Sequence, residues 1–169
     1  YFERKVRKTI RVYNMIDKKD IIAIAVSGGK DSMSLLYILN KILKPTKMKL
    51  IALAVDEGIK SYRDPNFAYV KKFCKKLKIQ LKICSFKKEF GNTLDEITKK
   101  DKKTIPCTYC GVFRRKLLNE KAIELGATKL ATGHNLDDEA QSILMNQLRK
   151  NIRASAILGP ITGIKDDPS

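Results

Sequence analysis

A glycine turn between a buried strand and a helix is the feature that most constrains how this chain folds. Residues 21–26 (IIAIAV) form a short apolar run, which is typical of a strand buried on both faces. Residues 31–43 (DSMSLLYILNKIL) have the apolar spacing of a helix, with acidic and hydroxyl side chains in its first turn. The linker between them is Ser27-Gly28-Gly29-Lys30. This order indicates an α/β fold in which the loop lies at the carboxyl end of a strand.

The rest of the chain repeats the alternation of strands and helices. Further apolar runs predict strands at residues 50–55, 79–84 and 129–132, and helical spacing predicts helices at residues 3–16, 66–78, 93–103, 110–125 and 137–149. Gly126 is expected to end the helix over residues 110–125. The alternation predicts an α/β fold with a parallel, twisted sheet flanked by helices on both faces. We expect an N-terminal basic helix over residues 1–18 and one larger domain over residues 19–169.

The net charge of the chain indicates which kinds of partner it binds. The 169 residues include 35 Lys and Arg against 18 Asp and Glu, a formal net charge of +17, and 43% of them are hydrophobic. An excess of this size serves solubility or binds a polyanion, and a nucleic acid is the favoured partner. No apolar run approaches the roughly 20 residues that span a bilayer, so we expect a cytoplasmic protein with no membrane partner. The chain begins at Tyr1 and ends in a loop-like Asp-Asp-Pro-Ser, and we expect it to be part of a longer protein.

The loop over residues 27–32 (SGGKDS) has the chemistry of an anion site. Glycines let the backbone approach a ligand closely, and successive N–H groups at a helix N-terminus bind phosphate. Two serine hydroxyls and Lys30 add donors and a cation. A γ-phosphate loop of the Walker A type would need a glycine where Ile24 stands and a Ser or Thr where Asp31 stands. The alternatives are therefore a simple strand-to-helix turn and a phosphate loop of another kind.

A second polar cluster follows the fourth predicted strand. Residues 133–138 read GHNLDD, and other candidate segments follow two further strands at residues 27–32 and 55–58. Because ligands of a parallel sheet bind beyond the carboxyl ends of its strands, the three segments are expected at one edge. Taken alone, the two aspartates are ordinary charges of a helix N-terminus. His134, the single histidine of the chain, is then a packed or hydrogen-bonded residue.

Two of the four cysteines form a CxxC pair at the start of a predicted helix. The pair is Cys107 and Cys110, and a helix N-terminus is expected to lower the pKa values of its thiols. Three interpretations are open: a redox dithiol, half of a zinc site, or partial ligation of an iron–sulfur cluster. Cys74, in a predicted helix, and Cys84, at the end of a predicted strand, are expected to be small core residues.

The full loop SGGKDS resembles the SGGxDS signature of the PP-loop ATP pyrophosphatases, which have an adenine-nucleotide α-hydrolase-like, Rossmann-like fold. Enzymes of this family split ATP between its α and β phosphates and adenylate an oxygen of the substrate. The resemblance implies that the loop cradles the pyrophosphate end of ATP with the help of Mg²⁺. The implied loop residues are Ser27, Gly28, Gly29, Lys30, Asp31 and Ser32, and those bordering the adenosine are Ala25, Val26 and Val55.

The segment GHNLDD resembles a second motif of the same family, which lines the ATP site. The resemblance implies that Gly133 approaches the nucleotide and that His134 lies beside it. It also implies that Asp137 or, slightly favoured, Asp138 binds Mg²⁺ or acts as a general acid or base on the substrate.

The order of three segments along the chain resembles that of the tRNA 2-thiolation enzymes of the TtcA/TtuA group. The segments are the loop SGGKDS, then CTYCGVFRR at residues 107–115, then GHNLDDEA at residues 133–140. In that group a [4Fe–4S] cluster is held by the CxxC pair and one later cysteine. The resemblance therefore implies Cys107 and Cys110 as cluster ligands and catalytic residues, and Arg114 as a basic residue of the active site. No cysteine follows Cys110, so the third ligand lies beyond Ser169 or the chain departs from the pattern. Structural zinc is implied in segments that the chain lacks.

The function that the resemblance implies is ATP-dependent 2-thiolation of tRNA. The C2 oxygen of a pyrimidine, with uridine favoured, is adenylated, and sulfur then replaces it with release of AMP. Lys30 is expected to stabilise the charge of the first step. The implied partners are tRNA, a sulfur donor (sulfide or a ubiquitin-like thiocarboxylate carrier) and a second copy of the chain in a homodimer. Two alternatives stay open: another PP-loop tRNA-modifying ATPase such as a lysidine synthetase, and a non-catalytic RNA- or nucleotide-binding module.

Overall fold

The computed structural model describes residues 1–59, 63–100, 106–156, 158–159 and 161. The chain divides into two compact units, Lys18–Gly133 and a smaller unit that joins Tyr1–Asp17 with His134–Ser169. The expected division into residues 1–18 and 19–169 stays a prediction. Within the described residues, no helix combines the length and the apolar character needed to cross a membrane.

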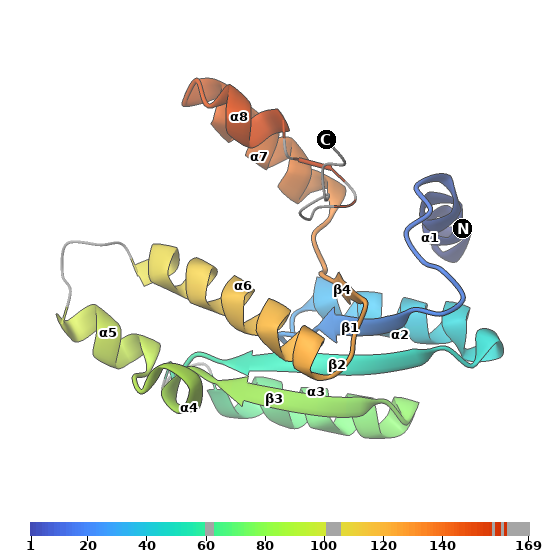
Figure 1. Ribbon diagram of the computed structural model, residues 1–169, viewed down its shortest axis with the longest axis horizontal. Helices are drawn as coiled ribbons and strands as arrows, with labels where there is room; N and C mark the ends of the chain where they lie inside the picture. Colours follow the sequence, from blue (N-terminus) through green and yellow to red (C-terminus); the bar gives the residue numbers. More distant parts are fainter. Residues whose placement is uncertain (60–62, 101–105, 157, 160, 162–169) are drawn as a thin grey trace. The chain divides into compact units, whose positions relative to one another are not determined.

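The unit Lys18–Gly133 is built on a parallel sheet, and Figure 1 shows its strands side by side. Among the described residues the strands are β1 (Ile21–Ala25), β2 (Lys49–Asp56), β3 (Gln80–Ser85) and β4 (Lys129–Ala131), in the order β3-β2-β1-β4. The chain builds outward from β1 to β2 and β3, and then returns to the other side of β1 for β4. The strand order therefore reverses at β1, and sheets of this kind bind ligands in the crevice outside the strand ends at such a point. The predicted parallel α/β fold is confirmed.

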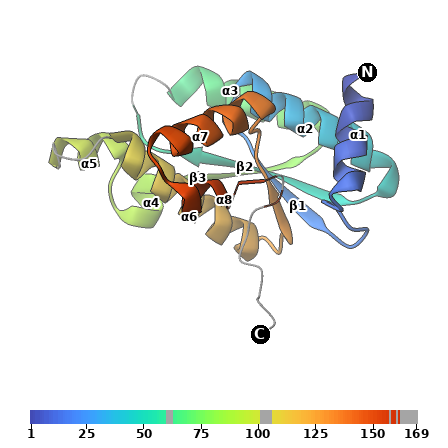
Figure 2. The same ribbon diagram turned by 90° about the horizontal axis from the view of Figure 1, so that it is seen from above.

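Helices cover both faces of this sheet (Figures 1 and 2). Helices α2 (Lys30–Leu43) and α3 (Arg63–Leu77) contact each other and pack on one face, while α6 (Pro106–Glu124) packs on the opposite face against β2 and β4. The 3-10 turn η1 (Lys44–Thr46) extends α2, and the short helices α4 (Phe86–Phe90) and α5 (Leu94–Lys100) follow β3. The two helical layers bury the central strands on both faces, which explains their continuous apolar sequences.

Strand β1 supplies the centre of the core. Its residues Ile22, Ala23 and Ile24 are 1%, 0% and 0% exposed. They are buried because β1 has a strand on each side and a helical layer on each face. Ala23 packs with Leu53 and Leu117 on the side of α6, and the alternation of a strand places its two neighbours on the other face. The core therefore fixes the carboxyl end of β1, from which the glycine loop leaves.

Helix α1 (Phe2–Val12) is shorter than the predicted helix over residues 3–16, whose end was therefore wrong. Asn14 has a φ of 47°, in the left-handed region, and the N–H of Met15 donates to the C=O of Ile10 at 2.9 Å. This pattern is a Schellman end, in which asparagine is tolerated because its short polar side chain permits the left-handed conformation. The apolar spacing continued past the true end of the helix.

Helix α6 begins earlier than predicted, at Pro106 instead of residue 110. Proline suits the first position of a helix because its missing N–H has no partner there and its φ is already near the helical value. Both cysteines of the CxxC pair therefore lie inside the first two turns of α6. Gly126, with a φ of 72°, ends this helix as expected, and the N–H of Ala127 closes the end at 2.9 Å from an α6 carbonyl.

The smaller unit contains α1, α7 (Leu136–Leu148) and α8 (Ile152–Ala156). Helix α7 confirms the predicted helix over residues 137–149, and it contacts α8. The elements η1, α4 and α8 were not predicted, because each has only 3 to 5 residues and cannot show helical periodicity. The described part of the predicted helix over residues 93–103 is α5, and residues 101–103 lie outside the described residues.

A substitution at Gly58, which lies shortly after β2, tests how closely this end of the sheet is packed. Its φ is 82°, and a Cβ added here would lie 2.5 Å from the Cβ of Thr93. We predict that Gly58→Ala lowers the free energy of unfolding by about 3 kcal/mol, because left-handed strain and overpacking add. The control is Gly91→Ala, where φ is 75° but no described atom lies within 4 Å of the added Cβ. At Gly91, strain alone should lower the free energy of unfolding by about 1 kcal/mol. Urea unfolding measures both variants, and equal losses would contradict the close packing of Gly58 against Thr93.

Candidate active site

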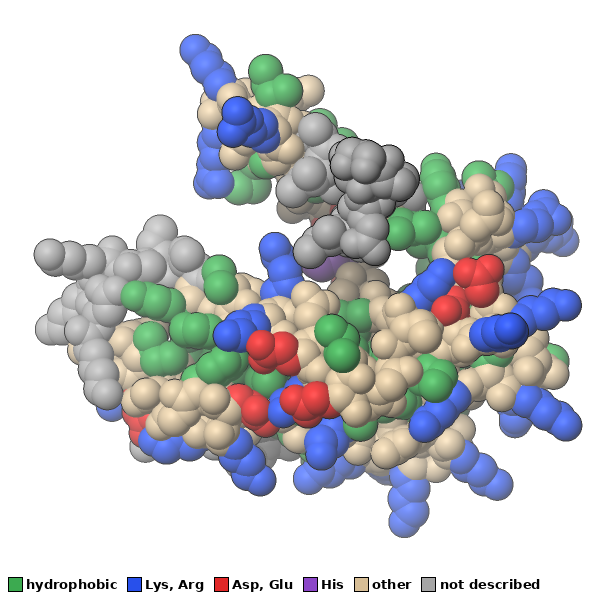
Figure 3. Space-filling model, viewed as in Figure 1, with side chains coloured by type: hydrophobic (Ala, Val, Ile, Leu, Met, Phe, Trp, Pro, Cys, Tyr) green, Lys and Arg blue, Asp and Glu red, His purple; other side chains and the backbone are tan. Residues whose placement is uncertain are grey.

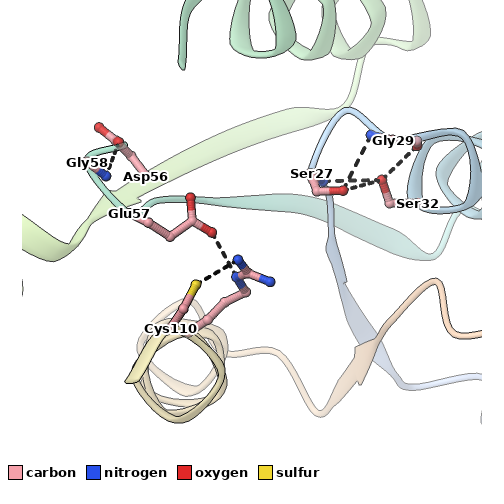
Figure 4. Close-up of polar contacts among 8 residues, drawn as sticks. Ser27, Gly29, Ser32, Asp56, Glu57, Gly58 and Cys110 are labelled. Atoms are coloured by element: carbon pink, nitrogen blue, oxygen red, sulfur yellow. Dashed lines mark hydrogen bonds and ion pairs between the residues drawn. The ribbon is translucent and has the colours of Figure 1, made fainter. Parts of the chain in front are cut away.

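The turn after β1 is held by hydrogen bonds among its own residues (Figure 4). The N–H of Ser27 donates to Oγ of Ser32 at 3.2 Å, and Oγ of Ser32 donates to the C=O of Gly29 at 3.0 Å. The two serine Oγ atoms lie 3.2 Å apart. Gly28 has a φ of 86°, a conformation that favours glycine. Ser32, which is only 8% exposed, thus ties the loop into a fixed curve at the carboxyl end of β1.

The start of α2 has the properties of an anion site. Its N-cap is Gly29, which has no side chain to bond the first N–H groups of the helix. These N–H groups carry partial positive charge and bind anions such as phosphate. The side chains of Lys30 and Asp31 are exposed in the same turn. The structure thus brings together the predicted loop residues 27–32, whose individual roles toward a nucleotide stay predictions.

Gly133 lies against the start of α2. A Cβ built on Gly133 would come within 2.9 Å of the backbone N of Ser32 and 3.1 Å of the carbonyl carbon of Asp31. Glycine is needed here because two backbones approach closely, and not because of its φ, which is outside the left-handed region. The turn after β4 and the loop after β1 are therefore in contact where the strand order reverses. Gly133 confirms this shared edge for the start of the predicted segment 133–138, and the position of residues 134–138 beside the loop stays a prediction.

The residues that follow Gly133 form the start of α7. Asn135 is the N-cap, and its Oδ1 accepts the N–H groups of Asp137 at 2.8 Å and Asp138 at 3.1 Å. In return, Oδ2 of Asp138 accepts the N–H of Asn135 at 2.8 Å, which completes a capping box. His134 is exposed. Asn135 had no predicted function, although an asparagine with an acidic residue three positions later is a capping signal. The Mg²⁺ and acid–base roles of the two aspartates stay predictions.

Cys110 lies on α6 and faces the end of β2. Its side chain is 9% exposed, and its Sγ accepts a hydrogen bond from Nη2 of Arg114 at 2.9 Å (Figure 4). The Nε of Arg114 donates to Oε1 of Glu57 at 2.8 Å, and Glu57 directly follows β2. A guanidinium beside the sulfur favours negative charge on it, and the thiolate is the form of cysteine that binds metals and attacks carbon. The contact therefore links the predicted residue Arg114 to one of the two predicted cysteines.

Cys107 lies three residues before Cys110 on the same helix. Residues at this spacing share a face of an α-helix. The side chain of Cys107 lies outside the described residues, so its predicted role stays a prediction.

Glu57 is a residue of the site that the sequence did not identify. The segment over residues 55–58 was expected near the site because it follows a strand, and only Val55 was named within it. The partner of Glu57, Arg114, is 57 residues away in the sequence. No local pattern reports a pairing at that separation, although an acidic residue at the carboxyl end of a buried strand is itself a signal for a site.

Three residues were predicted to border the adenosine. Ala25 and Val55 are partly buried and pack against the apolar cluster that contains Cys110. Val26 is 4% exposed, and its N–H donates to the C=O of Leu53 at 2.9 Å. Val26 therefore offers little surface to a ligand, whereas Ala25 and Val55 lie on the same side of the sheet as the cysteine helix.

Cys74 and Cys84 are core residues, as predicted. They are 1% and 4% exposed, respectively. Burial raises the pKa of both thiols, which disfavours the thiolate that a metal requires. Among the described residues, no three His, Cys, Asp or Glu side chains are grouped as metal ligands.

Basic side chains are spread over the surface of the unit Lys18–Gly133, and Figure 3 shows many of them. Exposed lysines follow one another on α3 and β3: Lys71, Lys72, Lys75, Lys76 and Lys82. Other lysines are neutralised locally. Lys121 lies 2.9 Å from both Glu89 and Glu124, and these hydrogen bonds, that of Glu89 first, raise the pKa of Lys121. The formal net charge of +17 attracts polyanions.

The chain is similar to the PP-loop domain family and to proteins named for sulfur transfer and tRNA thiolation. The sequence model of the PP-loop domain family matches residues 2–162. A probable sulfurtransferase of Methanocaldococcus jannaschii is 47% identical over 157 residues, which are 89% of this chain and 46% of that protein. A cytoplasmic tRNA 2-thiolation protein 1 of Caenorhabditis briggsae is 40% identical over 169 residues, which are 98% of this chain and 45% of that protein.

A solved structure is also similar to this chain, the U34-tRNA thiolase NcsA from Methanococcus maripaludis with its [4Fe-4S] cluster. The TM-score is 0.81 at 41% sequence identity, and the match covers 96% of this chain and 53% of that chain. This chain therefore spans about half the length of the relatives that it matches.

Ser32→Ala tests whether the loop is held by its own hydrogen bonds. The change removes the acceptor of the Ser27 N–H and the donor to Gly29, so we predict a loss of about 1 kcal/mol in the free energy of unfolding. Hydrogen exchange of the Ser27 amide should become faster. The control is Ser34→Ala, an exposed serine of the same helix, which should change stability by less than about 0.5 kcal/mol. Exchange of the Ser27 amide at the wild-type rate in Ser32→Ala would show that the loop does not depend on these bonds.

Proposed function

This chain belongs to the PP-loop domain family, and we propose that it forms the ATP-binding part of an enzyme that thiolates tRNA. ATP adenylates the C2 oxygen of a tRNA pyrimidine, with uridine favoured over cytidine, and sulfur replaces this oxygen with release of AMP. The names of the relatives, a cytoplasmic tRNA 2-thiolation protein 1 and a U34-tRNA thiolase, support this substrate. Because the chain spans about half the length of these relatives, the activity is proposed for the whole protein.

The observation that carries the proposal is the position of two motifs at one edge of one sheet. Strands β1 and β2 are parallel neighbours, so they end at the same edge. The phosphate loop follows β1, and Glu57, which follows β2, is bonded through Arg114 to Cys110. A reaction that activates an oxygen with ATP and replaces it with sulfur needs both functions in one site, and this arrangement supplies both.

The first step explains why the loop is not a γ-phosphate loop. A carbonyl oxygen is a poor leaving group, whereas AMP leaves readily. The C2 oxygen attacks the α-phosphorus of ATP, the bond from that phosphorus to the bridging oxygen breaks, and pyrophosphate leaves. The loop N–H groups and Lys30 stabilise the negative charge that moves onto the pyrophosphate, and Mg²⁺ would neutralise the same phosphates. The fixed loop suits this task because its donors need no rearrangement as the charge develops.

The second step exchanges sulfur for the activated oxygen. A sulfur nucleophile attacks C2, the C2–O bond breaks, and AMP leaves with the original base oxygen. Sulfide and a thiocarboxylate on a ubiquitin-like carrier both deliver sulfur at the oxidation state of the product, so this step needs no external oxidant or reductant. With the thiocarboxylate, the sulfur remains joined to the acyl carbon of the carrier after AMP leaves. Water then cleaves this acyl–sulfur bond, which frees the thiolated base and leaves the carrier as a carboxylate.

Cys107 and Cys110 would hold the iron–sulfur cluster. Two thiolates on one face at the start of a helix suit such a cluster. The Sγ of Cys110 contacts a guanidinium, which favours the thiolate that binds a metal. When bound, the cluster supplies an iron that can carry sulfur. A complete cluster requires a ligand from outside the described residues, because these hold no group of three metal ligands.

The tRNA would be held by the basic surface. The exposed lysines of α3 and β3 suit contacts with phosphates, which position an RNA without reading its sequence. The relative named as a cytoplasmic protein supports a location in the cytoplasm, where tRNA is modified.

We predict that Cys107→Ala and Cys110→Ala, introduced separately into the chromosomal gene, abolish the 2-thiolated pyrimidine of tRNA, because each removes a sulfur ligand. Mass spectrometry of tRNA nucleosides measures this product. The control is Cys74→Ala, since Cys74 is a buried thiol of α3 outside the site, and this variant should keep the product. Thiolation at the wild-type level in both test variants would overturn the proposal and favour another PP-loop tRNA-modifying ATPase.

Gly133→Ala is predicted to weaken ATP binding at least about tenfold, or about 1.4 kcal/mol. The added methyl group would lie 2.9 Å from the backbone N of Ser32, so the start of α2 must move, and the phosphate donors move with it. Gly159→Ala is the control, because the nearest described atom lies 3.9 Å from its added Cβ. Calorimetric titration with a non-hydrolysable ATP analogue compares the two, and equal affinities would contradict the contact between the two turns.

A further inference from the structure

Glu57 holds the side chain of Arg114 in its contact with Cys110. The Nε of Arg114 donates to Oε1 of Glu57 at 2.8 Å, and Nη2 of the same guanidinium donates to Sγ of Cys110 at 2.9 Å. We propose that Glu57 is a positioning residue for sulfur transfer, which keeps the guanidinium of Arg114 directed at the cysteine sulfur. This inference rests on the proposed function and adds to it a residue that acts through another side chain.

The backbone of Glu57 is anchored on both sides. Its C=O accepts the N–H of Leu94 at 2.7 Å, and the next N–H, that of Gly58, donates to Oδ1 of Asp56 at 3.0 Å. The side chain of Glu57 is 16% exposed, whereas that of Arg114 is 47% exposed. The carboxylate is therefore the fixed partner. A long, half-exposed arginine side chain has many rotamers available and needs such a partner to stay in one of them.

Because the guanidinium is rigid, a hydrogen bond at one of its nitrogens fixes the direction of the donors on the others. The group is planar, and its five N–H donors point at fixed angles. Because Glu57 binds at Nε, the Nη2 donor can turn away from Cys110 only if the first bond breaks. Without Glu57, Arg114 would exchange its sulfur contact for water. The sulfur of Cys110 would then lose the cation that lies at a set position beside it. That cation stabilises negative charge on the sulfur during sulfur transfer.

A purely structural ion pair leads to a different expectation. Ion pairs with a well-exposed partner, such as Arg114 at 47%, contribute little to folding stability. The same helix carries a comparison pair, Lys116 with Glu120 at 3.7 Å, whose side chains are 58% and 50% exposed. If Glu57 serves only the fold, its removal should resemble the removal of Glu120 in every measurement. If it positions Arg114, sulfur transfer should change while stability stays close to that of the Glu120 variant.

The test uses the full-length protein with tRNA, ATP and sulfide, and compares wild type with Glu57→Ala, Glu57→Gln and the control Glu120→Ala. We expect Glu57→Ala to lower kcat for thiolation at least about tenfold, with KM for ATP and ATP–pyrophosphate exchange within about twofold of wild type. Glu57→Gln should recover most of kcat, because its amide oxygen still accepts the Nε–H bond. In an Arg114→Ala background, Glu57→Ala should have no further effect, because Glu57 acts through Arg114.

A second measurement does not depend on activity. The Nε–H signal of Arg114 in ¹⁵N NMR spectra, assigned by its loss in Arg114→Ala, reports the bond to Glu57 directly. This signal should exchange slowly with water in wild type, Glu57→Gln and Glu120→Ala, and quickly in Glu57→Ala. If the melting temperature of Glu57→Ala is lower than that of Glu120→Ala, the variant Glu57→Asp is used in place of Glu57→Ala. Glu57→Asp keeps the negative charge but shortens the side chain by one methylene. It should show the same loss of kcat.

The outcomes separate this inference from the proposed function. A wild-type protein that forms no thiolated tRNA would overturn the proposed function, and the role of Glu57 with it. Thiolation by the wild type, with Glu57→Ala equal to Glu120→Ala, would overturn the role of Glu57 alone. Additive losses from Glu57→Ala and Arg114→Ala would overturn it as well, because they would show that Glu57 acts independently of the arginine.

Discussion

The pairing of β1 with a parallel strand on each side is the constraint on which the rest of the structure depends. It makes β1 the centre of the sheet and reverses the strand order there, so the chain leaving β1 enters the crevice where such sheets bind ligands. Close backbone packing at this point dictates residue types. Gly28 adopts a left-handed φ, and Gly133 leaves no room for a side chain beside Ser32. The shape of this candidate anion site is thus a consequence of how the sheet is connected.

The same parallel arrangement explains how the residues of the two proposed chemical functions come to share one edge. The loop after β1 provides backbone donors and a lysine, while the end of β2 provides a carboxylate. Helix α6 crosses the sheet on the opposite side from α2 and brings Cys110 to that carboxylate through Arg114. In the proposed reaction, the loop after β1 serves the activation of the oxygen, and α6 with the end of β2 serves the delivery of sulfur. The sheet fixes the positions of these elements relative to each other.

Much of this architecture can be predicted from the sequence, because the long elements carry strong periodic signals. The strands and the helices α2, α3 and α7 were predicted to within a few residues of their observed ends. The failures have local causes: Asn14 ends α1 by adopting a left-handed φ, and Pro106 starts α6 before its apolar pattern begins. The candidate site divides in the same way. Motifs of fixed local spacing could be found, whereas the bond between Glu57 and Arg114 depends on how α6 packs on β2.

In the proposed mechanism, the oxygen of the base leaves with AMP. The most direct measurement supplies the full-length protein with ATP, sulfide and tRNA that carries ¹⁸O at C2 of the target uridine, and analyses the nucleotide product by mass spectrometry. We expect AMP with the label in its phosphate, formed in step with the thiolated nucleoside. Unlabelled AMP, or ADP in its place, would rule out this mechanism, because either would mean that ATP was split without activating the base.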